Sequence, residues 1–274
     1  MARKLFCQLC PLTYKLSTWK GRALRHARDA LSGQRFAAHR QDAILPVSVY
    51  KHSSLIRRRL GNVDMLLQEN KAVNLALAAP VLTNVVIRPG ETFSFWRLVG
   101  NATARRGFRE GLTISDGRTK SGIGGGMCQM TNLIHWMVLH TPLTITEHHH
   151  HDGMDLFPDY NRQIPFGTGT SICYNYLDYR FRNDTDTTYQ LLVRVDGEYL
   201  RGELRSDRPQ PFTYHIKTEG EGFVEENRQF YRIGRVWRET LDPHTGTCTE
   251  RTLLRENHAR VMYDLPEEMK PPTA

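Results

Sequence analysis

The chain has 274 residues, of which 39% are hydrophobic and 24% are charged, and its formal net charge is +8. This composition is typical of a globular protein with a substantial core and argues against a disordered or fibrous chain. No apolar run reaches the roughly 18 residues of a membrane span, so we expect no transmembrane helix. The five cysteines, an odd number, argue against a disulfide scaffold and favour a reducing compartment.

The N-terminal segment, residues 1–47, is basic and predicts a helix. A helix over residues 14–31 would carry five basic side chains around an apolar strip, namely Lys15, Lys20, Arg22, Arg25 and Arg28. Such a helix is either a solvated helical face or one that lies on an anionic membrane surface. The segment lacks the pattern of a secretory signal, so we expect a cytoplasmic protein whose membrane contact, if any, is peripheral. No nucleic-acid motif accompanies the basic residues, and we expect no nucleic-acid partner.

The spacing of apolar residues changes from helical to β along the chain. Residues 63–80 have helical spacing, with Asn62 as a candidate N-cap and Pro80 at the end. Alternating apolar residues and turn signals then predict strands, at 85–87, 92–95, 112–115, 118–120, 143–147, 170–181, 189–195, 199–206, 212–218, 230–239 and 251–263. We therefore predict an α+β fold. It has an N-terminal helical region, a central mixed or antiparallel sheet with a cysteine-bearing helix packed on it, and a β-rich C-terminal extension.

The strongest signal for chemistry is a glycine-rich turn that leads into a helix. Gly124, Gly125 and Gly126 precede Cys128, and helical periodicity follows. Cys128 is therefore expected at a helix N-terminus, where unpaired N–H groups and the helix dipole lower the pKa of a thiol. The alternative is a packed thiol, because free cysteines are among the most buried residues.

A nucleophilic cysteine needs a base that a third group orients. Four consecutive histidines, residues 148–151, follow a predicted strand, and alternate members would point to opposite faces. His149 and His151 share one face and are the candidate bases, while Asn175 and Asp178 are the candidate orienting groups.

Backbone N–H groups around Gly126 to Gln129, next to Gly124 and Gly125 and helped by the Gln129 side chain, would hold the oxyanion. The histidines could instead bind a metal together with Asp152 and Asp155, or form an exposed polar loop. Consecutive histidines on one strand diverge, so we predict no metal and no other cofactor.

Several sequence blocks, taken in order, carry a resemblance to a known family. They are Lys51–Leu55 with Arg58–Gly61, Glu69–Lys71 with Asn74–Leu75, Arg88–Trp96, Val99–Gly100, Gly124–Gln129, Asn132–Trp136, Leu139–Thr144, Phe157–Asp159, Pro165–Gly169 and Asp178–Asn183. With these blocks the chain resembles the VanW family over about residues 48–206. The resemblance implies an association with vancomycin resistance and cell-wall metabolism, without an established biochemical activity.

The resemblance also bears on the site and on the domain boundaries. His151 is the best match to a histidine that the family places shortly after the cysteine helix. The family's acidic motif corresponds to Gly167–Ser171, which lacks an acid, so Asp178 or Asn175 would have to serve. We expect the VanW-like domain over 48–206, a β-rich extension over 207–264 and a disordered tail over 265–274.

These observations lead to hypotheses from different functional classes. The first is a cysteine-dependent amidase or acyltransferase that acts on peptidoglycan-like amides. The second is a non-catalytic module whose glycine cradle binds the carboxylate of a cell-wall peptide ending in D-Ala or D-lactate. The third is an accessory structural protein that uses Trp96, Trp136 and the N-terminal helix as contact surfaces. The sequence leaves the oligomeric state open.

Overall fold

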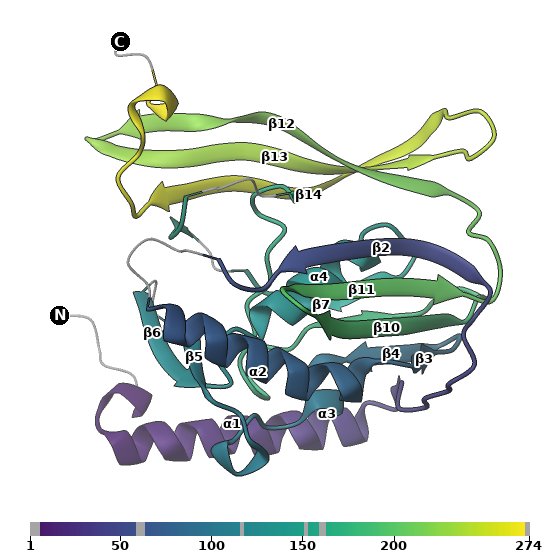
Figure 1. Cartoon of the computed structure of the whole chain (residues 1–274), viewed down its shortest axis with the longest axis horizontal. Helices are drawn as coiled ribbons and strands as arrows, with labels where there is room; N and C mark the ends of the chain where they lie inside the picture. The colour runs from purple at the N-terminus through teal and green to yellow at the C-terminus, as the bar shows by residue number, and fades with distance from the viewer. Residues whose placement is uncertain (1–5, 59–63, 116–117, 151–152, 159–162, 272–274) are drawn as a thin grey trace.

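The computed structural model describes residues 6–58, 64–115, 118–150, 153–158 and 163–271 (Figure 1). One antiparallel sheet has the strand order β2 (Val47–Leu55), β11 (Tyr199–Ser206), β10 (Tyr189–Asp196) and β3 (Val85–Ile87). A second sheet has the order β1 (Arg35–Phe36), β4 (Glu91–Ser94), β9 (Arg180–Arg182) and β7 (Thr144–Glu147). In the second sheet only β1 pairs in parallel with its neighbour. Together with the helices, these sheets confirm the predicted α+β class.

The helices differ in how they meet the sheets. Helix α2 (Met65–Leu82) contacts β10 and the hairpin formed by β5 (Glu110–Ser115) and β6 (Arg118–Ile123), and α4 (Cys128–Val138) contacts β2 and β11. The short helix α3 (Phe95–Val99) follows β4 directly. Helix α1 (Pro11–Leu31) lies along the outer edge of the molecule (Figure 1). Fully buried side chains from α2, α4 and both sheets form one hydrophobic core.

The ends of α2 differ from the prediction. Asp64 caps the helix, because its Oδ1 accepts from the N–H of Leu66 at 2.8 Å, while the expected cap Asn62 lies outside the described residues. The helix continues through Pro80 to Leu82. A proline in the last turn removes a single helical hydrogen bond, so it is tolerated there.

The predicted strand over 170–181 is wrong for most of its length. Residues 173–177 form a turn closed by the Cys173 N–H donating to the Leu177 carbonyl at 2.9 Å. Asn175 takes a left-handed conformation with φ of 50° at this turn, which asparagine tolerates better than most residues. Only Arg180–Arg182 is a strand, β9.

The C-terminal extension is a separate sheet with longer strands than expected. It has the order β12 (Thr213–Glu226), β13 (Gln229–Leu241), β14 (Cys248–Val261) and β8 (Met154–Asp155). Asn227 and Arg228 join β12 to β13 with φ of 51° and 61°, which is typical of a type I′ hairpin turn. Residues 265–271, which the sequence predicts to be disordered, are described and include the short helix η3 (Glu267–Met269).

Candidate functional site

The glycine loop before α4 is packed against the β5–β6 hairpin. Gly124 and Gly126 have φ of 78° and 88°, values that glycine adopts readily. Gly125 lies so close to Gly111 that a Cβ built on it would be 2.1 Å from the Gly111 carbonyl carbon and oxygen. The loop therefore requires glycine at each of these positions, and α4 begins at Cys128 as predicted.

Several of the N–H groups expected to hold an oxyanion already donate within the protein. Those of Gly124, Gly125 and Gly126 have acceptors at 3.0, 3.0 and 2.9 Å, the carbonyl oxygens of Arg109, Gly122 and Leu112. These bonds fasten the start of α4 to the hairpin. In this conformation the three groups are not open to a ligand.

The Gln129 side chain is also engaged. Its Nε2 donates to the Ser54 Oγ at 2.8 Å and to the Leu55 carbonyl at 2.9 Å. This side chain therefore ties the first turn of α4 to the end of β2.

Cys128 is half-buried, and its immediate surroundings do not favour the thiolate. Burial raises the pKa of the Cys128 thiol, although the N–H groups of Ile172 and of Cys128 itself act in the opposite direction. The neighbouring Cys173 thiol adds to the increase. None of the described histidines is among the groups that shift this pKa, so the thiol is mostly protonated at neutral pH.

Three of the described histidines pack against one another. The rings of His135 and His148 have centroids 4.1 Å apart, and those of His148 and His150 are also 4.1 Å apart. The buried His135 is 3.1 Å from the hydroxyl of Tyr179, and burial together with the two neighbouring histidines keeps its pKa well below the usual range. His135 is therefore neutral at pH 7 and serves the core. Tyr179 is a partner that the sequence does not reveal.

Of the two candidate bases, the structure describes only one. His149 Nε2 lies 3.0 Å from Oε1 of Glu147, so this imidazole is paired with a carboxylate on β7. His151 lies outside the described residues, and its catalytic role stays a prediction. Across the described residues, no group of three or more metal-ligating side chains is placed to hold an ion.

The candidate orienting groups bond to other partners. Asp178 accepts hydrogen bonds from the Ser94 hydroxyl at 2.6 Å and from the Trp96 N–H at 3.0 Å, and this carboxylate holds α3. Asn175 Nδ2 is 2.6 Å from Nε2 of His26 on α1. Neither contact involves a histidine that shifts the pKa of Cys128.

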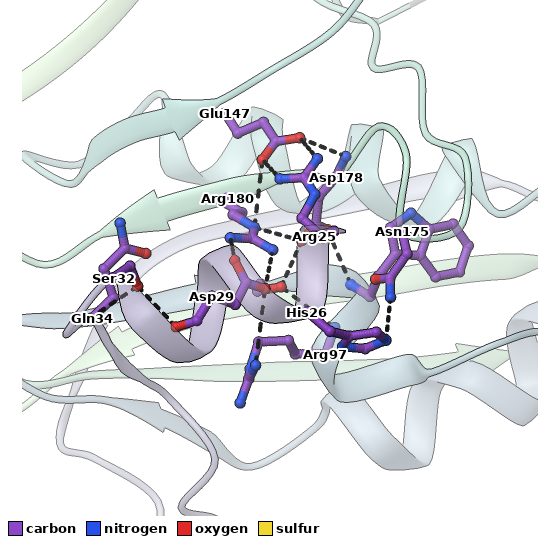
Figure 2. Close-up of polar contacts among 12 residues, drawn as sticks. Arg25, His26, Asp29, Ser32, Gln34, Arg97, Glu147, Asn175, Asp178 and Arg180 are labelled. Carbon is purple, nitrogen blue, oxygen red and sulfur yellow. Dashed lines mark hydrogen bonds and ion pairs between the residues drawn. The ribbon is translucent and has the colours of Figure 1, made fainter. Parts of the chain in front are cut away.

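A network of ion pairs connects α1 to Glu147 and Arg180, close to Asp178 (Figure 2). Arg25 contacts both carboxylate oxygens of Glu147 at 2.5 and 2.6 Å, and Arg180 contacts both oxygens of Asp29 at 2.7 and 2.8 Å. Burial would raise the pKa of Glu147, but hydrogen bonds from Arg25, the Asp178 N–H and His149 lower it to about 2. The carboxylate is therefore ionised throughout the physiological range.

A buried lysine that the catalytic hypothesis does not use lies beside the glycine loop. Lys71 on α2 is only 7% exposed, and a Cβ built on Gly126 would lie 2.2 Å from its Cγ. In the described part of the chain its ammonium has no hydrogen-bond or ion-pair partner. Burial, reinforced by Arg58 and Arg57, lowers the pKa of Lys71 to about 7. A buried cation without a counter-ion indicates a position that a ligand can complete.

Other positively charged groups lie near Lys71. Arg57 and Arg58 follow β2 and lie close enough to Lys71 to lower its pKa, and Glu69 pairs with Arg57 at 2.7 Å on the exposed side. Within the described residues the N–H groups of Met127 and Cys128, in the first turn of α4, donate to no other residue. We call Lys71, Arg58 and the Met127–Cys128 turn the cationic site.

The sequence contains a signal for this site that is easy to overlook. Gln68, Lys71 and Asn74 recur at intervals of three residues in a helix that is otherwise largely apolar, and all three are buried. Asn74 Nδ2 donates to the Gly125 carbonyl at 2.9 Å, which sets the glycine loop against this polar face. A buried polar stripe of this kind is a stronger indicator of a site than an isolated thiol.

A pocket lies elsewhere in the described part of the chain. It has a volume of about 620 Å³ and is lined by the start of β2, the end of α4 and the start of β12. Tyr50 and His140 stack in its wall with ring centroids 3.7 Å apart. Cys128 and Lys71 are not among its lining residues. The cationic site is therefore recognised from the charge and the burial of its residues, and not from this pocket.

Comparisons with known proteins place the chain in a family. The model for the VanW like protein family matches residues 70–205. The Vancomycin B-type resistance protein VanW of Enterococcus faecalis (strain ATCC 700802 / V583) is 34% identical over 269 residues, which cover 98% of each chain. The Uncharacterized protein YoaR of Bacillus subtilis (strain 168) is 29% identical over 118 residues, 42% of this chain and 36% of its own length.

No solved structure matches the chain. The similarity to the Enterococcus protein extends well beyond the stretch that the family model matches, into the N-terminal helix and the C-terminal sheet. The match to the family model and this whole-length identity lead to one conclusion: the chain belongs to the VanW family.

Proposed function

We propose that this protein binds the carboxylate end of a cell-wall peptide at the cationic site. The observation that carries the proposal is Lys71, a buried ammonium without a counter-ion next to an open helix N-terminus. A carboxylate placed there would pair with the ammonium, accept from the Met127 and Cys128 N–H groups and benefit from the helix dipole. It would also offset the repulsion between Lys71 and Arg58.

The donor groups of the site and the similarity to a named protein both support the proposed ligand class. A single lysine with two backbone donors matches a compact anion with two oxygens better than a highly charged phosphate chain. A relative with nearly the same length is named for vancomycin resistance, which favours peptides that end in D-Ala or D-lactate. The proposed activity is recognition, without a covalent step.

Binding should depend on Lys71 and on pH. The probe is a diacetyl-Lys-D-Ala-D-Ala peptide, titrated calorimetrically, with a C-terminally amidated peptide as the ligand control. Lys71→Met keeps the aliphatic stem against Gly126 but removes the charge, and we expect about 10–100-fold weaker binding. Affinity should fall as the pH rises above about 7, since the pKa of Lys71 is about 7 and only the ammonium attracts the carboxylate.

The control variant is Lys51→Met, because the Lys51 side chain is 65% exposed on β2 and pairs with Glu203. It should bind like the wild type. Lys71→Met should unfold at a higher temperature than the wild type at pH 7, because the substitution removes a desolvated charge. Equal affinity of the free and amidated peptides, or unchanged binding by Lys71→Met, would refute the proposal.

Cysteine-dependent acyl transfer is the second candidate, and one observation supports it. Cys128 retains some exposure, and the Ile172 N–H acts on its sulfur in the direction that favours the thiolate. His151 would have to supply the base.

Alkylation of Cys128 tests this second candidate. Because burial raises the pKa of its thiol, we expect iodoacetamide at about pH 6.5 to label Cys128 more slowly than glutathione. Mass spectrometry would follow each cysteine, with the exposed Cys248 as internal reference. Labelling of Cys128 faster than both references, lost in Cys128→Ser, would favour acyl transfer over recognition.

A further inference from the structure

Helix α1 docks on the protein through its charged face. Arg25 and Asp29, one turn apart, reach Glu147 and Arg180 on the sheet β1-β4-β9-β7 (Figure 2). Asp29 and Arg180 are nearly buried, with side chains 7% and 8% exposed. Polar side chains thus occupy the inner face, where an amphipathic helix of a globular protein normally places apolar ones.

The inner face also explains a glycine in the middle of the helix. A Cβ built on Gly21 would lie 2.6 Å from Cε2 of Tyr176, so the helix backbone packs directly on this ring. Arg25 also donates to the Tyr176 carbonyl at 3.0 Å. Gly21, Arg25 and Asp29 recur every four residues and define the docked side.

The outer face of α1 is apolar. Leu12, Leu16 and Trp19 follow one another at helical spacing and are 65%, 49% and 71% exposed. The exposed alanines 23, 27 and 30 continue the same line toward the C-terminus. Other exposed leucines are Leu9 before the helix, Leu24 within it and Leu31 at its end. A continuous apolar stripe with this much exposure marks an interaction surface.

The charges beside the stripe are all positive. Lys15, Lys20 and Arg28 are exposed, while Asp29, the one acidic residue of α1, is paired with Arg180 on the inner face. Two copies of this helix would bring like charges together if they associated along the stripe. The pattern fits a partner that is apolar inside and negatively charged at its surface.

We propose that the outer face of α1 docks on an anionic membrane surface. Leu12, Leu16 and Trp19 would insert among the acyl chains near the headgroups, and Lys15 and Lys20 would contact anionic lipid. None of the described helices is long and apolar enough to cross a bilayer, so the helix would lie in the interface. Docking would leave the ion pairs of the inner face intact and hold the rest of the protein at the membrane.

The test is co-sedimentation of the full chain with vesicles of phosphatidylcholine, with or without phosphatidylglycerol. We expect binding to the anionic vesicles and a blue shift in tryptophan emission, because Trp19 leaves water. The double variant Leu16→Gln/Trp19→Gln should bind at least about tenfold more weakly. Lys15→Gln/Lys20→Gln should lose the preference for phosphatidylglycerol and the dependence on salt.

Leu66→Gln is the matched control, because Leu66 is 61% exposed on α2, away from this surface. It should bind vesicles like the wild type, and all variants should keep the wild-type circular dichroism. Absence of vesicle binding by the wild type would overturn the proposal. So would a concentration-dependent dimer that Leu16→Gln/Trp19→Gln abolishes, because the stripe would then bind a second copy. The proposal is independent of the peptide site, which can succeed or fail separately.

Discussion

Replacing Arg180 with methionine should lower the free energy of unfolding by about 3–5 kcal/mol, the range typical of a broken buried ion pair. The Arg180 guanidinium is 2.7 Å from both Asp29 and Asp178 and 3.5 Å from Glu147. Without it, three carboxylates would face one another in a largely buried region. Glu147 would keep Arg25 in bidentate contact, and Asp29 would keep only the longer ion pair with Arg97 at 3.9 Å.

Urea denaturation near neutral pH measures the effect. Arg182→Met is the control, because Arg182 lies on the same strand but its side chain is 50% exposed and pairs with the exposed Asp184. A surface pair of that kind contributes at most about 1 kcal/mol. If the two substitutions destabilise the protein equally, the network does not hold α1 in the way described.

Acid should weaken the wild-type network in a defined range. The pKa of Glu147 is lowered to about 2 from its usual 4.5, so its contribution is complete above about pH 4.5 and is lost as the pH falls toward 2. In Arg180→Met the clustered carboxylates would bind protons more readily. The stability difference between this variant and the wild type should therefore shrink on acidification.

Gly125→Ala should destabilise the protein by about 2–3 kcal/mol, as for a severe case of overpacking. The added methyl would lie 2.1 Å from the Gly111 carbonyl carbon and oxygen, and both sides of this contact are backbone. No side-chain rotation can relieve the clash, so the hairpin and the start of α4 must move apart. That movement would also displace Gly126 from Lys71 and should weaken peptide binding.

Thermal unfolding would measure the loss of stability, with Gly222→Ala as the control. A Cβ on Gly222, in strand β12, would have no atom within 4 Å, so this substitution should be nearly neutral. Equal melting temperatures for the two variants would show that the loop tolerates a side chain at Gly125.

The sequence predicts the local features of the site and misses those that depend on distant contacts. Glycine spacing and helical periodicity place Cys128 at the start of α4, where it is found. They carry no information on the carbonyl groups of the hairpin, which occupy the glycine N–H groups. Burial raises the pKa of Cys128 and the Ile172 N–H lowers it, and both effects come from residues outside the local pattern.

Lys71 and α1 show the same difference between local features, which the sequence predicts, and features that depend on distant contacts. A lysine in a helix is expected at the surface, but Gly126 lies close against the stem of Lys71. The apolar strip of α1 is visible in the sequence, but its orientation depends on Glu147 and Arg180, which are 122 residues from Arg25 and 151 from Asp29. The strand prediction around Asn175 is wrong because a tight turn overrides the local β pattern.

The manner in which α1 is attached has a consequence for how this helix can move. The face of α1 that contacts the protein consists mainly of ionic groups, which hydrate readily. Separation of α1 from the protein would therefore expose little apolar surface to water. The more exposed pair, Arg25 with Glu147, should then weaken with dissolved electrolyte more than the nearly buried pair, Asp29 with Arg180.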